Sequence, residues 1–320
     1  SNGLLARITT TISDMNITMT SLVARMDKNN NVIVNFSIRW VPWCNMSERP
    51  FAQASLHTAL VVLTVFCVAL VASNMIRPRD LWRVAALCGV FFLGIPTLMF
   101  FRDYLVANLL VVLSMYNVMR IQDHPGEEKA KVFFASFFVV LAGWFVPAAV
   151  AFMAVVYVGV LVFSPSDIRT WLIPLAGVAA SYILLVTYEV VWLGGDSFFP
   201  ELSSRLFAMP YTEKVFKADG FYFYLVCLLL AWGWAYAKYW RFAWGETIPR
   251  KKRFFVISAM GLTALAIAAL LLRYKYLVVF FAVPFSVVIA RFFAVATASQ
   301  RTAMRWYLVA VAGLGLLFFK

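Results

Sequence analysis

The sequence predicts an all-α polytopic membrane helix bundle of about ten membrane segments, preceded by a small mixed extramembrane segment. Of the 320 residues, 63% are hydrophobic and only 13% are charged. Apolar runs about as long as a transmembrane helix recur from residue 57 to the end of the chain. This composition is typical of a multi-pass membrane protein and excludes a soluble domain with a large core.

The net charge of +13 could indicate a nucleic-acid partner, but the basic residues stand in short clusters between apolar runs. Anionic lipid headgroups and the excess of Lys and Arg in cytoplasmic loops explain such clusters more simply. We therefore predict membrane lipids as partners and no nucleic acid.

Residues 1–55 form a predicted extracytoplasmic N-terminal segment, rich in Ser, Thr and Asn. After the turn signal "NNN", the stretch "VIVNFSIRW" at residues 32–40 alternates apolar and polar side chains, which predicts a β-strand. One strand is not stable alone in water. Residues 32–40 should therefore pair with a hairpin partner, lie on the membrane surface or bind another protein.

Residues 56–320 form the predicted bundle. Besides an uncharged stretch at 133–163, its apolar spans fall at 57–76, 84–101, 104–120, 171–193, 221–240, 254–272, 276–296 and 306–320. The uncharged stretch has 31 residues, about 46 Å as one helix against a hydrocarbon core of about 30 Å. It is too long for one span and too short for two full ones.

Loop charges decide between these possibilities. The basic loops at 77–83 and 241–253 should be cytoplasmic. Counting spans forward from the first loop places the start of the 133–163 stretch on the cytoplasmic side, and counting backward from the second loop places its end on the same side. Pro147 can break the helix in the middle. We therefore predict a short helical hairpin at 132–164; the alternative is a single kinked, tilted helix, which would place the arginines of the second loop outside.

Four stretches carry a resemblance to known families: "RDYLVANLLVVLSMYNVMR", "HPGEEKAK", "LAGWFVPAAVAFM" and "SPSDIRTWLIPLAGVAASYILL". Over residues 75–195 the chain resembles a family of uncharacterised bacterial polytopic inner-membrane proteins. More distantly it resembles the C-type glycosyltransferases, which implies polyprenyl-phosphate sugars as substrates at the outer face and an acidic base or metal ligand in an outer loop. This chain differs from those enzymes in its first part, because residues 1–55 contain neither an initial span nor a clear acidic pair.

Two carboxylates are the candidate catalytic residues. Asp103 lies in the tight outer turn "FFRDYL" and Glu189 near the outer end of its span, and ionisable groups this close to hydrocarbon are candidate site residues. Alternatively, Asp103 caps a helix that begins at Tyr104 while Arg102 reaches headgroups. Asn108 could bind the ligand or join two helices.

The outer loop at 194–220 and the nearby "RYKY" motif supply further candidates for substrate binding. Asp196 and Glu201 are the acids of the loop, and Arg205 offers a fork for phosphate. Arg273 and Lys275 should lie on the same side and could bind lipid phosphate. The alternative is an amphipathic connector between spans, with the two cations as interfacial anchors.

At the cytoplasmic side we expect the aromatic residues from Trp232 to Trp244 to form an interfacial belt, and Arg291 to extend to headgroup phosphate. No motif of a phosphate-binding glycine loop or a zinc site is present, so a divalent cation at the outer carboxylates is the one cofactor we consider.

Three functions remain open. The one chosen for testing is a lipid-linked sugar or phosphate transferase at the outer face of a bacterial inner membrane, with Asp103 or Glu189 as base or metal ligand and polyprenyl phosphate as a possible partner. The second is a non-catalytic subunit of a cell-envelope complex that offers residues 32–40 to another protein. The third is a lipid or small-solute transporter or flippase.

Overall fold

The computed structural model describes residues 19–26, 32–38, 50–94, 102–122, 126–165, 167–193, 218–270 and 275–318. The chain divides into two compact units, Ser1–Leu56 and His57–Lys320. Each is described by itself.

The N-terminal unit contains an antiparallel pair of strands, β1 (Met19–Met26) and β2 (Val32–Ile38). Val23 lies opposite Asn35 in this register. The strand predicted from the alternating pattern is therefore confirmed over residues 32–38, and its partner is a segment of the same chain. A role for residues 32–40 in binding another protein stays a prediction.

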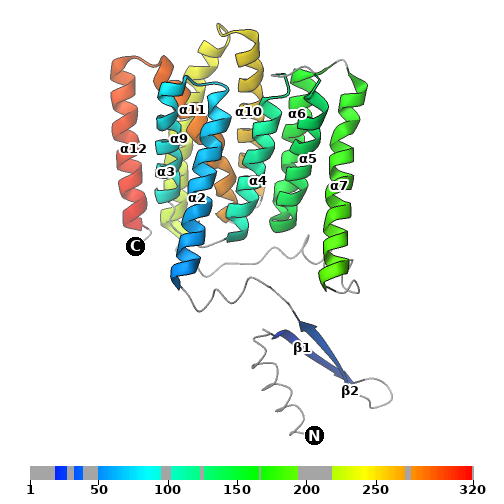
Figure 1. Ribbon diagram of the computed structural model, residues 1–320. Coiled ribbons are helices and arrows are strands. Elements are labelled where there is room, and N and C mark those ends of the chain that lie inside the picture. The colour runs from blue at the N-terminus through cyan, green and yellow to red at the C-terminus, as the bar shows by residue number, and fades with distance from the viewer. Residues whose placement is uncertain are drawn as a thin grey trace. The chain divides into compact units, whose positions relative to one another are not determined.

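The second unit is helical throughout its described part, and Figure 1 shows its helices packed side by side with nearly parallel axes. Among the described residues, ten α-helices and three short 3-10 helices, of which α2 begins before residue 57, have the following bounds: α2 Pro50–Ser73, η2 Pro78–Asp80, α3 Leu81–Gly94, α4 Arg102–Met119, α5 Glu128–Phe145, η4 Pro147–Phe152, α6 Met153–Phe163, α7 Ile168–Leu193, α9 Ala218–Ala243, α10 Ile248–Leu270, η5 Lys275–Phe281, α11 Ala282–Val295 and α12 Ala298–Phe318.

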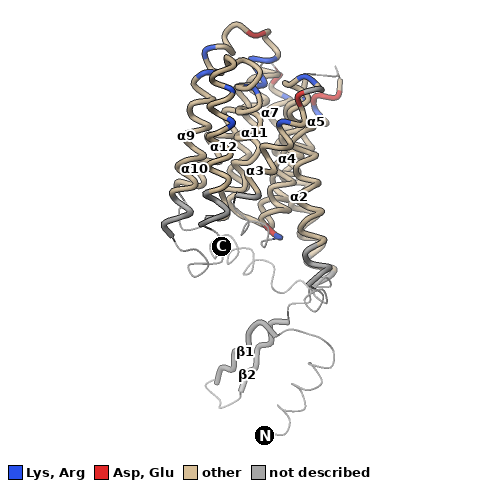
Figure 2. Tube along the Cα trace, turned by 90° about the vertical axis from the view of Figure 1, so that its left-hand side faces the viewer, with Lys and Arg blue, Asp and Glu red and all other residues tan. Residues whose placement is uncertain are grey.

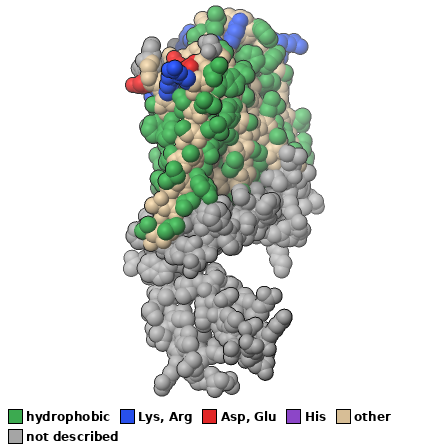
Figure 3. Space-filling view, turned by 90° about the vertical axis from the view of Figure 1, so that its right-hand side faces the viewer, with side chains coloured by type: hydrophobic (Ala, Val, Ile, Leu, Met, Phe, Trp, Pro, Cys, Tyr) green, Lys and Arg blue, Asp and Glu red, His purple; other side chains and the backbone are tan. Residues whose placement is uncertain are grey.

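Four stretches of these helices are long and apolar enough to cross a membrane: Ser55–Ser73, Ile168–Tyr188, Ile248–Ala269 and Tyr276–Val295. Leu81–Phe92 and Pro147–Phe163 are apolar but shorter. Figure 3 shows hydrophobic side chains covering the flank of the helical unit below a charged rim. These features are typical of a membrane protein, while the predicted total of about ten membrane segments stays a prediction.

The uncharged stretch at 133–163 folds as a hairpin. Helix α5 ends at Phe145, Val146 leaves the helical region with φ −136° and ψ 103°, and Pro147 begins η4. Helix α5 then packs against η4 and α6, and Figure 1 shows α5 and α6 running in opposite directions. The break lies at the predicted proline, because Pro147 has no amide hydrogen to continue the helical ladder and disfavours helix at Val146. The alternative of one kinked helix is wrong.

Small residues bring α5 and α7 close together. Ser181 on α7 donates a hydrogen bond to the Phe137 carbonyl on α5 at 3.2 Å. A Cβ atom added to Gly177 would meet the Phe133 carbonyl oxygen at 2.8 Å, so only glycine fits there. Such close approach is how helices gain contact in a membrane, where burial of apolar surface gives no preference for protein over lipid.

Charged residues gather at one end of the helical unit, as Figure 2 shows. We call it the charged end: the helices α2, α4, α6, α9 and α11 finish there, and the described connecting residues 74–80, 120–122, 126–127, 164–165, 167, 244–247 and 296–297 lie on it. The other end is called the opposite end.

Candidate functional site

The predicted pair Arg102 and Asp103 lies in the first turn of α4, at the opposite end. The Arg102 Nε atom is 3.7 Å from Asp103 Oδ1, and the two side chains are 43% and 60% exposed. An ion pair this exposed contributes little to stability. Because α4 begins at Arg102 and not at Tyr104, Asp103 stands inside the first turn and is not the N-cap residue that one alternative expected.

Asn108, one turn further along α4, is completely buried. Neither atom of its side-chain amide has a hydrogen-bond partner within the described part of the chain. Nearby on the helix, the Tyr104 ring contacts the Tyr276 ring with centroids 5.4 Å apart. The predicted bond between helices is therefore absent at Asn108 among the described residues, and its role in binding a ligand stays a prediction.

The other predicted residues of the outer site are only partly described. Glu189 lies in α7 and Lys275 begins η5, but their side chains are outside the described part. Asp196, Glu201, Arg205 and Arg273 lie outside the described residues altogether. A shared site of these groups with Asp103 therefore stays a prediction.

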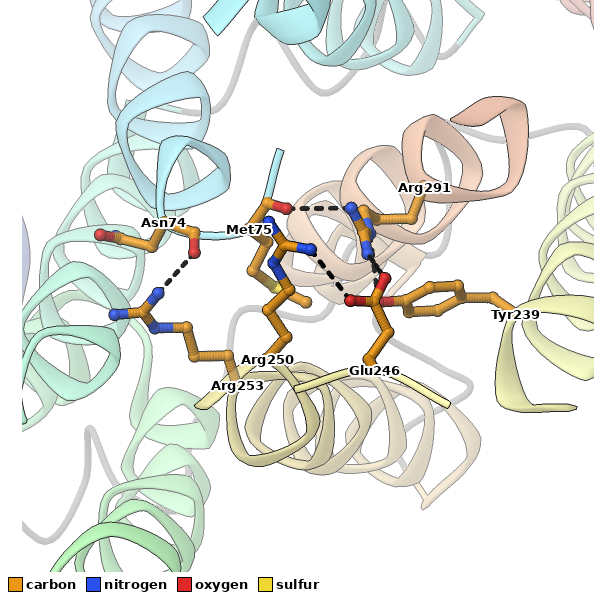
Figure 4. Close-up of polar contacts among 7 residues, drawn as sticks. All are labelled: Asn74, Met75, Tyr239, Glu246, Arg250, Arg253 and Arg291. Carbon is orange, nitrogen blue, oxygen red and sulfur yellow. Dashed lines mark hydrogen bonds and ion pairs between the residues drawn. The ribbon is translucent and has the colours of Figure 1, made fainter. Parts of the chain in front are cut away.

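The charged end holds a buried ion pair that the sequence did not predict. Arg291 on α11 donates from Nε to the Tyr239 hydroxyl at 3.1 Å, from Nη1 to the Met75 carbonyl at 3.0 Å and from Nη2 to Glu246 Oε1 (Figure 4). Its side chain is 9% exposed. The expectation that Arg291 extends to headgroup phosphate is wrong, because protein acceptors on three elements bind all three of its nitrogens.

Glu246 is the acidic partner in this network. Its side chain is 8% exposed, and its second oxygen, Oε2, accepts a hydrogen bond from Arg250 Nη1 at 3.0 Å. The carboxylate therefore lies between two guanidinium groups (Figure 4). Removal of water from both charges is costly, and it is offset only when the remaining hydrogen-bonding atoms are also paired, as they are here.

Two arginines also bind the turn that directly follows α2. Arg253 on α10 donates to the Asn74 carbonyl at 2.6 Å, next to the Met75 carbonyl that accepts from Arg291. The last carbonyl groups of a helix have no partners within the helix and carry partial negative charge. Cations bound to the turn lie near this partial charge and join the end of α2 to α10 and α11 (Figure 4).

The aromatic residues between 232 and 244 divide into exposed and buried side chains, and the interfacial belt stays a prediction for the exposed ones. Trp234 and Trp244 are exposed, whereas Tyr239 is buried beneath the Arg291 guanidinium, 5.0 Å from its ring centroid. Trp232 is also buried and donates from Nε1 to the Pro284 carbonyl. Residues on one face of α9 therefore belong to the core.

A cavity of about 820 Å³ opens beside the ion pair. It is lined by the C-terminal end of α2, the first residues of η2 and α3, the α9–α10 connection, and parts of α10, α11 and α12: Ser73, Asn74, Met75, Ile76, Arg77, Pro78, Asp80, Trp82, Arg83, Phe242, Gly245, Glu246, Arg250, Arg291, Phe293, Ala294, Val295 and Arg301. Five arginines and two carboxylates give this lining a net charge of +3.

The two carboxylates already have cationic partners. Asp80 forms an ion pair with Arg83 at 3.0 Å, and Glu246 is bound by Arg250 and Arg291. Within the described part of the chain, no carboxylate forms an ion pair with Arg77 or Arg301.

Arg301 has a further unsatisfied group. Its Nε atom is buried and has no hydrogen-bond acceptor among the described residues. A buried donor without an acceptor is costly, and a charged one more so. Arg301 lies in the first turn of α12, where the helix dipole adds positive potential. The arrangement therefore favours an oxyanion at this point of the cavity.

Among the described residues, no group of three or more His, Cys, Asp and Glu side chains comes together that could hold a metal ion. The divalent cation considered for the outer carboxylates stays a prediction.

Comparisons with protein-family models, curated proteins and solved structures find no match to this chain. The resemblance to bacterial inner-membrane proteins and C-type glycosyltransferases therefore stays a prediction as well. The cavity is the candidate functional feature that sequence reasoning missed. Two signals pointed to it: Arg291 is the one charge inside the apolar run 276–296, and Glu246 is the one acid in the basic loop 241–253.

Proposed function

We propose that this protein is a multi-pass membrane protein that binds a phosphate-bearing anion in the arginine-lined cavity at its charged end. One observation carries the proposal: Arg77 and Arg301 line the cavity without a carboxylate partner among the described residues, and the Nε atom of Arg301 is buried without an acceptor. A bound anion would supply the negative charge for both guanidinium groups and the hydrogen-bond acceptor for the Arg301 Nε atom.

Phosphate suits this cavity better than a single carboxylate does. Guanidinium groups bind phosphate oxygens through paired, charge-assisted hydrogen bonds. In the cavity they come from separate elements, with Arg77 after α2 and Arg301 on α12. Donors arriving from several directions match a tetrahedral oxyanion, and a volume of about 820 Å³ accommodates a ligand larger than the phosphate alone.

The charged end faces the cytoplasm in this proposal, because the Lys and Arg residues of the connections collect there. All ten α-helices of the second unit then belong to the membrane region, with the N-terminal unit outside and the inner membrane as the location. Polyprenyl phosphate, considered as a partner of the predicted transferase, has the chemistry that the cavity favours. The carboxylates Asp103 and Glu189 lie at the opposite end, so a transfer reaction there would use a second site.

The test compares two variants of the full-length protein in neutral detergent. The probes are inorganic phosphate and phosphatidic acid, and the measured quantity is the dissociation constant. The double variant Arg77→Gln with Arg301→Gln should bind the preferred probe about 10- to 100-fold more weakly, because it loses two charged donors.

Arg305→Gln is the matched control, since Arg305 is an exposed arginine of the same helix that does not line the cavity. It should bind as the wild type does. Equal binding by the wild type and the double variant, or no binding of either probe to the wild type, would overturn the proposed function.

A further inference from the structure

We infer that the ligand of this cavity is a lipid whose phosphate head carries two negative charges. This inference rests on the proposed function and names the class of the anion. It depends on the apolar part of the cavity lining, on the count of unpaired cations and on the position of the cavity beside the apolar flank.

The lining combines guanidinium groups with exposed aromatic side chains. Trp82 on α3 and Phe242 on α9 both line the cavity, and they are 65% and 47% exposed. Both helices pack against α11 and α12, so the two rings stand on different walls. The Arg83 guanidinium lies 5.7 Å from the Trp82 ring centroid, so a positive charge and an apolar surface lie next to each other in the lining.

Buried apolar side chains line the interior of the same cavity. Met75, Ile76 and Phe293 are each less than 9% exposed. A free phosphate ion would gain nothing from such a lining, because apolar surface offers no hydrogen bonds. An amphiphile would place its head at the arginines and its first methylene groups against these side chains, and the removal of those methylene groups from water would favour its binding.

The helices that line the cavity carry exposed apolar side chains along their length. Trp82 on α3, Leu230 on α9 and Val309 on α12 are examples, so a lipid can approach the cavity along these helices. Trp and Tyr residues at the ends of such helices commonly mark the headgroup level of the bilayer. The acyl chains can therefore stay in the membrane while the head enters the cavity.

The charge of the head follows from the count of unpaired cations. Three of the five arginines have a carboxylate partner, and the other two, Arg77 and Arg301, have none among the described residues. Arg250 and Arg291 share one carboxylate, so the described lining has a net charge of +3, and a head with two negative charges offsets this charge better than a head with one. A phosphomonoester lipid and a lipid with two phosphodiesters both meet this condition, and a lipid with one phosphodiester does not.

The experiment uses four probes on the full-length protein in zwitterionic micelles. They are phosphatidic acid (a monoester lipid), cardiolipin (two diesters), phosphatidylglycerol (one diester) and glycerol 3-phosphate (a soluble monoester). We expect phosphatidic acid or cardiolipin to bind at least about tenfold more tightly than phosphatidylglycerol, because the second negative charge makes an additional charge-assisted contact with an arginine. Which of the two binds more tightly identifies the source of the double charge.

A pair of tryptophan variants tests whether the cavity binds a lipid or a free phosphate. Trp82→Ala should weaken the binding of phosphatidic acid and leave glycerol 3-phosphate unchanged. Trp306→Ala is the matched control, because Trp306 is 70% exposed and does not line the cavity.

Two results would overturn the inference while leaving the proposed function intact. Glycerol 3-phosphate could bind as tightly as phosphatidic acid, with no effect of Trp82→Ala, which would identify a free phosphate. Phosphatidylglycerol could bind as tightly as the doubly charged lipids, which would show that the charge count does not select the head. Failure of all four probes, with inorganic phosphate, would instead reject the proposed function.

Discussion

The two ends of the helical unit treat polar groups in different ways. At the charged end, Arg291 and Glu246 are buried, and each is bound by several partners. At the opposite end, Arg102 and Asp103 form a long, exposed pair, while the buried amide of Asn108 has no partner within the described residues. Charge near a membrane therefore does not by itself indicate a site; burial and the number of partners distinguish the two ends.

The comparison also separates two kinds of arginine at the charged end. Arg253 and Arg291 bind the backbone carbonyls of the turn directly after α2 and hold helices together. Arg77 and Arg301 line the cavity without carboxylate partners among the described residues. The first kind should affect stability when changed, and the second kind should affect binding.

The largest expected effect is on Arg291. Replacement by methionine removes three hydrogen bonds and leaves the buried Glu246 carboxylate with Arg250 as its one remaining cation among the described contacts. Breaking a buried pair in this way typically costs about 3–5 kcal/mol, so Arg291→Met should lower the midpoint of thermal unfolding markedly in mild detergent.

A second variant isolates the buried charge. In Arg291→Met with Glu246→Gln, the uncompensated carboxylate is gone, and part of the lost stability should return. An unchanged unfolding midpoint in the single variant would show that the ion pair does not stabilise the charged end.

The next effect should have the opposite sign. Leucine has the branching of asparagine without its polar atoms, so Asn108→Leu removes a buried amide that has no partner among the described residues. Leaving such a group unsatisfied costs about 1–3 kcal/mol, and the variant should unfold at a higher temperature. A lower unfolding midpoint would mean that Asn108 has a partner, such as a ligand or a bound water molecule.

A smaller effect is expected at Asp167, which precedes α7 at the charged end. Its Oδ2 accepts from the Thr170 hydroxyl at 2.7 Å and its Oδ1 from the Arg169 amide at 3.0 Å. The Thr170 hydrogen bond is the main cause that lowers the pKa of Asp167 below its ordinary 3.8. Asp167→Ala should therefore unfold at a slightly lower temperature near neutral pH.

The pH dependence of that difference follows from the sign of the shift. A lowered pKa in the folded state adds stability above the ordinary pKa, and this stability is lost as pH falls through the lowered value. The wild type and Asp167→Ala should therefore converge in acid. A difference that stays constant across the pH series would show that the ionised carboxylate is not responsible.

The smallest effect on stability is expected for the exposed pair at the opposite end. Arg102→Gln should change the free energy of unfolding by less than about 1 kcal/mol, because the pair is long and solvated. The predicted transferase has a separate measurement: Asp103→Ala and Glu189→Ala should each remove a cell-envelope glycan at an unchanged protein level. Full glycan production in both variants would reject that hypothesis.

Local patterns predicted much of the helical unit and little of its site. The helix break follows from Pro147 itself, which can be recognised in the sequence. The charges of the connecting loops predict that α5 begins and α6 ends at the same end of the unit. The network at Arg291 joins residues 45, 52 and 216 positions away, and no local pattern encodes such pairings. The charge of Arg291 inside an apolar run was visible, but its partners depend on how α2, α9 and α11 pack.

The most direct test of the central claim is an experimental structure of the full-length protein in nanodiscs that contain phosphatidic acid. We predict a phosphate within hydrogen-bonding distance of the Arg301 Nε atom, with the adjoining acyl chain against Trp82. A cavity without lipid, in which a protein group accepts the Arg301 Nε hydrogen bond, would contradict the account.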